Sequence, residues 1–227
     1  MKVFIICLII VLLLFGFSGF MMYQAAWNPR PDKAVKGKKH VLCIGDSITF
    51  GAGVFPHNKT QSYPAYLSKL LSDEYQVINL GLSGRTLLST GDVPYTREKN
   101  YVRSFQIEDP VYILMLGTND AKPYNWDEES YERELRIFLK KYIAHAGKDK
   151  VNMMTLPQAF EEAFDIKKEN VAKAVEIIRR LGNELNINVI DLYDYTMNHS
   201  EWFKDGIHPN EIGNKEIAQY IYDHLFF

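Results

Sequence analysis

The chain has 227 residues, 47% of them hydrophobic and 24% charged, so it can fold around one buried core. Its 26 Lys and Arg are balanced by 28 Asp and Glu, and the net charge of -2 offers no general attraction to nucleic acid. Its two cysteines, Cys7 and Cys43, lie far apart, and no Cys-x-x-Cys or His-Glu-x-x-His segment is present. These features disfavour a nucleic-acid-binding protein and exclude a disulfide scaffold and a zinc site of a known motif.

The first part of the chain is an uncharged apolar run. Residues 3–23 would form a helix of roughly 31 Å, about the thickness of the hydrocarbon core of a bilayer. The run is longer than the apolar part of a usual signal peptide, and Gln24-Ala25-Ala26 matches a cleavage site poorly. We therefore predict an N-terminal membrane anchor over residues 1–23. A cleaved signal segment and a buried core helix are the alternatives.

The orientation of this anchor is set by the basic residues beside it. Only Lys2 precedes the run, whereas Arg30 and four lysines follow it before residue 40, and this asymmetry favours a cytoplasmic domain. Short N-terminal segments of this kind nevertheless commonly act as signal anchors. We therefore expect an extracytoplasmic domain, which would be secreted if the segment were cleaved.

Residues 24–39 contain Pro29, Pro31 and Gly37 with little periodicity, which predicts a linker before a domain over residues 40–227. In that domain, five short apolar runs predict buried strands at residues 41–44, 77–80, 111–116, 151–156 and 189–192. Because helical patterns alternate with these runs, the fold class expected is α/β, a three-layer α/β/α sandwich with a five-stranded parallel sheet.

Four amphipathic patterns predict the main helices. The first follows Pro64, the second spans residues 131–142 before Gly147, the third ends at Gly182, and the fourth follows Asn210. Each places apolar side chains at intervals of three and four residues, so each is expected to cover the sheet.

In open parallel sheets, ligands bind beyond the carboxyl ends of the strands. Ser47 follows the first predicted strand directly and is the candidate nucleophile. His208 is the candidate base, and Asp205 can reach its second ring nitrogen across a turn at Gly206. Asp191 and Asp194 are alternative carboxylates.

A tetrahedral intermediate needs hydrogen-bond donors for its oxyanion. Gly81 after the second strand offers a backbone N–H, Asn119 after the third offers a side-chain amide, and Ser47 offers its own N–H. Asp46 is interpreted as a residue that organises the loop, because Asp205 already supplies the acid.

These segments resemble a known family. Gly45-Asp46-Ser47-Ile48-Thr49, Asn79-Leu80-Gly81, Gly117-Thr118-Asn119-Asp120 and Asp205-Gly206-Ile207-His208-Pro209 are similar to the four blocks of the SGNH (GDSL) hydrolases, in family order. The resemblance implies a flavodoxin-like fold and ester hydrolysis without a metal or another cofactor. It also implies Ser47 as nucleophile, His208 as base and Asp205 as its partner.

The substrate is open at this stage. The segment after Gly117 looks similar to that of acetylesterases acting on carbohydrates, so an O-acetyl group on a glycan is the expected substrate. Aromatic residues in the loops expected near the site could stack on a sugar or line an acyl pocket: Tyr95, Tyr124, Trp126, Phe160 and Trp202. The alternatives are a lysophospholipase or other lipid esterase, a membrane-tethered glycan-binding module without turnover, and acetyl transfer to a sugar.

Overall fold

The structure is a computed structural model that describes residues 31–226. The predicted anchor and residues 24–30 of the predicted linker lie outside the described residues. Among the helices that are described, none combines the length and the apolar character needed to cross a membrane. Residues 31–38 form no helix or strand, and the N–H of Val35 donates to the side-chain oxygen of Gln76 at 2.7 Å.

A five-stranded parallel sheet forms the centre of the fold. Its strands are β1 (Lys39–Gly45), β2 (Tyr75–Asn79), β3 (Val111–Met115), β4 (Val151–Met154) and β5 (Asn188–Ile190). Their order is β2-β1-β3-β4-β5, and every neighbouring pair is parallel. The chain therefore changes direction across the sheet between β1 and β3, which is where open α/β sheets bind ligands.

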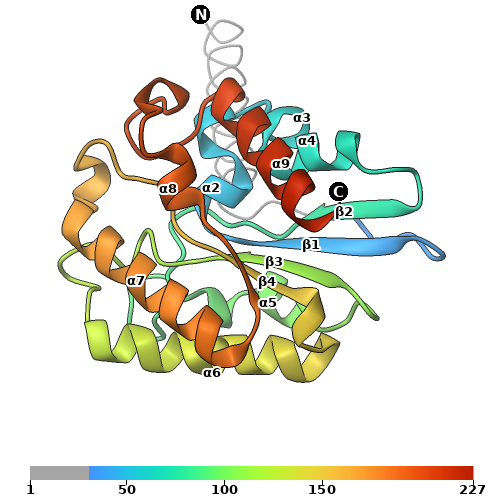
Figure 1. The fold of residues 1–227 in the computed structure, drawn as a ribbon, viewed down its shortest axis with the longest axis horizontal. Helices are drawn as coiled ribbons and strands as arrows, with labels where there is room; N and C mark the ends of the chain where they lie inside the picture. Colours follow the sequence, from blue (N-terminus) through green and yellow to red (C-terminus); the bar gives the residue numbers. More distant parts are fainter. Residues whose placement is uncertain (1–30, 227) are drawn as a thin grey trace, which may run out of the picture. The chain divides into compact units, whose positions relative to one another are not determined.

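Helices cover both faces of the sheet (Figure 1). On one face, α4 (Tyr63–Leu70) packs against α9 (Glu211–Leu225). On the other face lie α5 (Lys99–Ser104), α6 (Glu128–Ala146) and α7 (Lys168–Leu185). The shorter helices α2 (Ser47–Phe50), α3 (Asn58–Gln61) and α8 (Leu192–Thr196) belong to the connections. The predicted three-layer α/β sandwich with five parallel strands is confirmed.

The apolar runs locate all five strands but overestimate where four of them end. The sequence predicts strand ends at Leu80, Leu116, Leu156 and Leu192. Each of these leucines is buried to 1% exposure or less but lies beyond the last residue of its strand. These residues are apolar because they are buried, whether or not they pair in the sheet. An apolar run therefore continues past the end of its strand into the buried residues that follow it.

The third predicted helix was given the wrong end. Gly182 does not terminate α7, which continues to Leu185 and ends at Asn186 in the left-handed conformation. A Cβ on Gly182 would lie 2.1 Å from Cγ2 of Val189, so the glycine permits close packing of α7 on β5. The other predicted stop is confirmed, because α6 ends at Ala146 with Gly147 as its C-cap.

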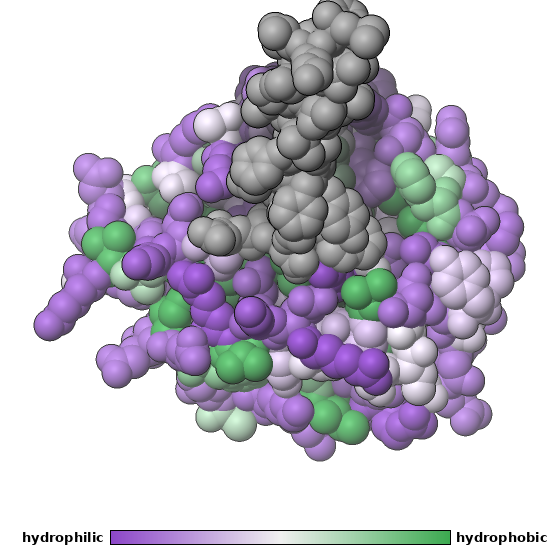
Figure 2. Space-filling model, turned by 180° about the vertical axis from the view of Figure 1, so that it is seen from behind, coloured by the Kyte–Doolittle hydropathy of each residue, from purple (hydrophilic) through white to green (hydrophobic). Residues whose placement is uncertain are grey.

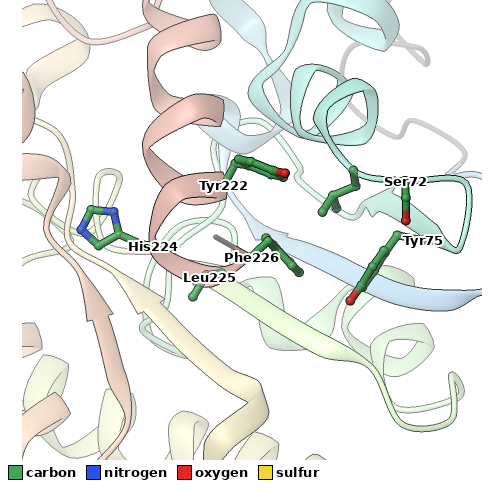
Figure 3. A pocket seen from close by; sticks show the side chains of 7 residues that line it. Ser72, Tyr75, Tyr222, His224, Leu225 and Phe226 are labelled. Atoms are coloured by element: carbon green, nitrogen blue, oxygen red, sulfur yellow. The ribbon is translucent and has the colours of Figure 1, made fainter.

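In the view from behind (Figure 2), the visible hydrophobic side chains of the described residues form small separate groups among hydrophilic ones. A cavity of about 460 Å³ lies between the start of β2 and the end of α9 (Figure 3). Tyr75, Tyr222 and Phe226 are among its lining residues. Since Tyr75 begins β2, this cavity lies at the amino end of that strand, away from the carboxyl ends.

Candidate active site

Ser47 is the first residue of α2 and follows β1 after a single residue, Asp46. Asp46 caps the helix, because its side-chain oxygen accepts the N–H of Ile48 at 3.0 Å. The Asp46 side chain is fully buried, and this burial raises the pKa of its carboxyl above the usual value. The short turn between β1 and α2 thus positions Ser47, and Asp46 has the organising role expected of it.

His208 and Asp205 come from the loop before α9. The Oδ1 atom of Asp205 accepts the backbone N–H groups of Ile207 at 3.1 Å and of His208 at 2.8 Å. Its Oδ2 atom lies 2.8 Å from Nδ1 of His208. Gly206 makes this turn possible with a φ of +78°, which is in the left-handed region that favours glycine. Both side chains of this four-residue segment therefore face each other, as predicted.

A chain of hydrogen bonds joins the three predicted side chains. The Nε2 atom of His208 lies 2.9 Å from Oγ of Ser47. Because an ionised carboxylate only accepts hydrogen bonds, Nδ1 of His208 carries a proton and Nε2 is free to accept the Ser47 hydroxyl. Burial opposes ionisation of Asp205, but hydrogen bonds from the backbone and ring of His208 outweigh it and lower the pKa of this carboxyl.

Asn119 lies beside the loop after β2. Its side-chain amide donates to the carbonyl oxygen of Arg85 at 3.1 Å. The next residue, Asp120, accepts the N–H of Leu87 at 2.9 Å and of Leu88 at 2.8 Å. Burial raises the pKa of Asp120 to about 7, although both of these hydrogen bonds act to lower it. Asn119, which is 5% exposed, is therefore held firmly at the carboxyl edge of the sheet.

The geometry argues against the predicted role of Gly81. Its N–H donates to the side-chain oxygen of Asn79 at 2.9 Å, so it is not available to an oxyanion. The Asn79 amide in turn donates to the carbonyl oxygen of Thr49 at 2.8 Å. A Cβ on Gly81 would lie 2.4 Å from the backbone nitrogen of Phe50. Gly81 thus allows the loop to pack closely against α2.

A second glycine in the same loop, Gly84, differs from Gly81 in the state of its backbone N–H. Within residues 31–226, the N–H of Gly84 forms no hydrogen bond. Gly84 directly precedes Arg85, whose carbonyl oxygen holds the Asn119 amide. Both glycines follow β2 in the same loop, so spacing along the sequence does not distinguish Gly84 from Gly81.

The structure places the alternative carboxylates elsewhere. Asp191 and Asp194 both bind Arg179, at 2.7 Å each, and so belong to a surface ion-pair group between α7 and α8. Among the aromatic candidates, Tyr95 is fully buried, with its hydroxyl on the carbonyl oxygen of Leu80. Phe160 packs on Phe203, with ring centroids 5.0 Å apart.

One aromatic residue near the site was missed by the sequence analysis. The ring centroid of Phe164 lies 5.2 Å from that of His208, at an interplanar angle of 69°. No periodicity or motif marks this residue, since it lies in an irregular loop.

The described residues contain no group of three or more His, Cys, Asp or Glu side chains that could hold a metal ion.

Comparison with known proteins identifies the family of this chain. The model of the GDSL-like Lipase/Acylhydrolase family matches residues 43–216, which include Ser47, Asn119, Asp205 and His208. The chain belongs to this family. It is also 32% identical over 201 residues to an acetylxylan esterase from Xylanibacter ruminicola. That match covers 80% of this chain but 42% of the relative, so the chain spans less than half the length of that protein.

Solved structures share the fold. A lipase/acylhydrolase from Enterococcus faecalis superposes with a TM-score of 0.65 at 22% identity, over 82% of this chain and 95% of that one. A carbohydrate acetylesterase from Sinorhizobium meliloti gives a TM-score of 0.66 at 21% identity, over 83% of this chain and 98% of that one. At these identities the similarity establishes the fold alone.

Proposed function

We propose that the protein is a serine esterase that hydrolyses short acyl esters, chiefly O-acetyl groups on a carbohydrate. The observation that carries this proposal is the continuous hydrogen-bonded chain from Ser47 through His208 to Asp205. Such a chain supplies a nucleophile, a base and a carboxylate that orients the base, which acyl transfer requires. Membership of an acylhydrolase family is consistent with it.

In the proposed reaction, Oγ of Ser47 attacks the ester carbonyl carbon while Nε2 of His208 takes the hydroxyl proton. Asp205 stabilises the resulting imidazolium. When the tetrahedral intermediate collapses, the C–O bond to the alcohol breaks and His208 returns the proton to the departing oxygen. Water, deprotonated by His208, then attacks the acyl-serine and releases the acid and the free Ser47 hydroxyl.

The oxyanion would be held by three donors. Ser47 is the first residue of α2, so its N–H has no partner within the helix and can point to the site. Asn119 contributes its side-chain amide. For the third donor we replace Gly81 by Gly84, because the N–H of Gly81 is already bound to Asn79 and that of Gly84 is unbonded within the described residues.

The acetyl-glycan assignment draws on two of the relatives. It rests on the relative named acetylxylan esterase and on the fold shared with a carbohydrate acetylesterase. A lipid esterase would use the same three side chains, so the lengths of acyl group accepted by the enzyme distinguish the two. Attachment to a membrane through residues 1–23, with the catalytic domain outside the cytoplasm, remains a proposal from the sequence.

The test is hydrolysis of p-nitrophenyl acetate, butyrate and palmitate by the full-length protein and its Ser47→Ala variant. The matched control is Ser72→Ala, which changes an exposed serine just before β2, at the opposite end of that strand from the site. We expect the acetate to be cleaved best and only Ser47→Ala to lose activity. Equal activity in Ser47→Ala would refute the serine mechanism, and a preference for palmitate would favour the lipid esterase.

A further inference from the structure

Phe164 is an unusual residue in its own loop. It lies in the 3-10 turn Ala163–Asp165, between β4 and α7, with φ +56° and ψ 30°. Asp165 also has a positive φ, of 63°. Two consecutive residues other than glycine in the left-handed region are strained, and a bulky side chain there is uncommon. Such strain persists only where the surrounding structure enforces it, and it is concentrated at functional sites.

The loop that carries Phe164 is fixed at both ends. At one end, the N–H of Phe160 donates to the carbonyl oxygen of Gly206 at 2.9 Å, between Asp205 and His208. At the other end, the N–H of Lys167 donates to the carbonyl oxygen of Ala121 at 3.2 Å, two residues after Asn119. The loop therefore bridges the two segments that supply His208 and Asn119.

The loop contains two large apolar residues, Phe164 and Ile166, but only one of them is buried. Ile166 is 2% exposed and belongs to the core, whereas Phe164 is 56% exposed. Nevertheless, the Phe164 ring contacts the His208 ring edge to face at 5.2 Å. The structure thus holds a large apolar ring against the candidate base and leaves much of it open to solvent.

The position beside His208 indicates which part of a substrate the ring would meet. In the proposed reaction, Nε2 of His208 returns its proton to the oxygen of the departing alcohol, so that oxygen must come within hydrogen-bond distance of Nε2. The acyl oxygen is directed to the three proposed donors, at Ser47, Asn119 and Gly84. A ring that contacts His208 is therefore adjacent to the alcohol.

We infer that Phe164 is a specificity-determining residue that binds the alcohol part of the ester, and that this alcohol is a sugar ring. An aromatic face packs well on the C–H groups of a pyranose, which is flat and apolar on one side, and gains little from a short alkyl alcohol. This inference rests on the proposed function and names the group that the same site recognises.

The test compares two acetate esters that differ only in the alcohol, namely methyl xylopyranoside triacetate and ethyl acetate. The variant is Phe164→Gly in the full-length protein, because glycine adopts the left-handed conformation without strain and should preserve the loop. Phe164→Tyr keeps the aromatic face. Ile137→Ala, which truncates a 50% exposed apolar side chain on α6, is the matched control.

We expect Phe164→Gly to lower kcat/KM for the xylopyranoside ester about tenfold and to change it less than about twofold for ethyl acetate, as loss of one apolar contact would. Phe164→Tyr and Ile137→Ala should behave like the wild type. The ratio of activities on p-nitrophenyl acetate and butyrate should not change in Phe164→Gly, because the acyl group is bound elsewhere.

Three results would overturn the inference. An equal loss on both alcohols would mean that Phe164 acts through His208, a changed acetate-to-butyrate ratio would place it at the acyl group, and no loss would mean that it does not contact substrate. Each of these leaves Ser47-dependent activity intact. If the wild-type protein cleaved no ester at all, the proposed function would fail and this inference would fail with it.

Discussion

The carboxylate of Asp205 holds His208 by both the ring and the backbone. One oxygen lies 2.8 Å from Nδ1, and the other accepts the backbone N–H of His208 at 2.8 Å. The ring can therefore neither rotate freely nor adopt the other tautomer while Asp205 is ionised. This arrangement fixes the basic nitrogen, Nε2, toward Ser47.

Asp205→Asn should consequently impair the chemical step far more than substrate binding. An asparagine retains an oxygen for the backbone N–H groups, but its amide favours the wrong tautomer of His208. We expect kcat to fall roughly 10³–10⁴-fold with a small change in KM, by analogy with other Ser-His-Asp triads. Steady-state kinetics on p-nitrophenyl acetate measure this. A variant with a tenth or more of the wild-type kcat would show that the carboxylate is not needed.

Asp205→Asn should also change how the free energy of unfolding depends on pH. The pKa of Asp205 is lower in the folded protein than its usual value, so its ionised form stabilises the fold above the unfolded-state pKa. That contribution is lost as the pH falls below about 4 and through the lowered folded-state pKa. We therefore expect wild type to be more stable than Asp205→Asn at pH 7 and the difference to shrink in acid. Urea unfolding from pH 7 to pH 3 measures it, and a constant difference would contradict the prediction.

Asn119→Ala should remove one oxyanion donor. Loss of one such donor lowers kcat by about 10²–10³-fold, with little effect on KM. The matched control is Asn125→Ala, since Asn125 donates to the backbone oxygen of Asn119 at 2.9 Å but belongs to the support of the loop. We expect Asn125→Ala to lower the thermal unfolding temperature with a smaller loss of kcat. Similar kinetic losses in the two variants would assign Asn119 a supporting role only.

Gly81→Ala tests the packing role that replaces the predicted catalytic one. The added methyl would lie 2.4 Å from the backbone nitrogen of Phe50 and 2.7 Å from the carbonyl carbon of Thr49, both in α2. Backbone atoms cannot move aside as a flexible side chain can, so we expect a loss of about 1–3 kcal/mol in the free energy of unfolding. Denaturant unfolding measures this loss, and an unchanged midpoint would show that α2 shifts without cost.

The amino-acid sequence alone was enough to predict the class of fold and most of the candidate site residues. Five apolar runs and four amphipathic patterns were sufficient for the sheet and for four of its covering helices, because burial of apolar side chains controls both periodicities. The short helix α5 was not among the predicted helices. Ser47, Asn119, Asp205 and His208 were found because each follows a strand or precedes the last helix in a short polar segment. Local signals of this kind depend on neighbouring residues only.

Tertiary structure decided what depends on distant parts of the chain. The sequence does not show which of Gly81 and Gly84 can donate to an oxyanion. The hydrogen bond from the N–H of Gly81 to Asn79 shows that Gly81 is a packing residue and leaves Gly84 as the candidate donor. Gly182 resembles a helix stop, but contact with Val189 gives it a place inside α7. Phe164 reaches His208 because hydrogen bonds at both ends of its loop hold it there. Each outcome is set by atoms that meet only after folding, so no local pattern encodes it.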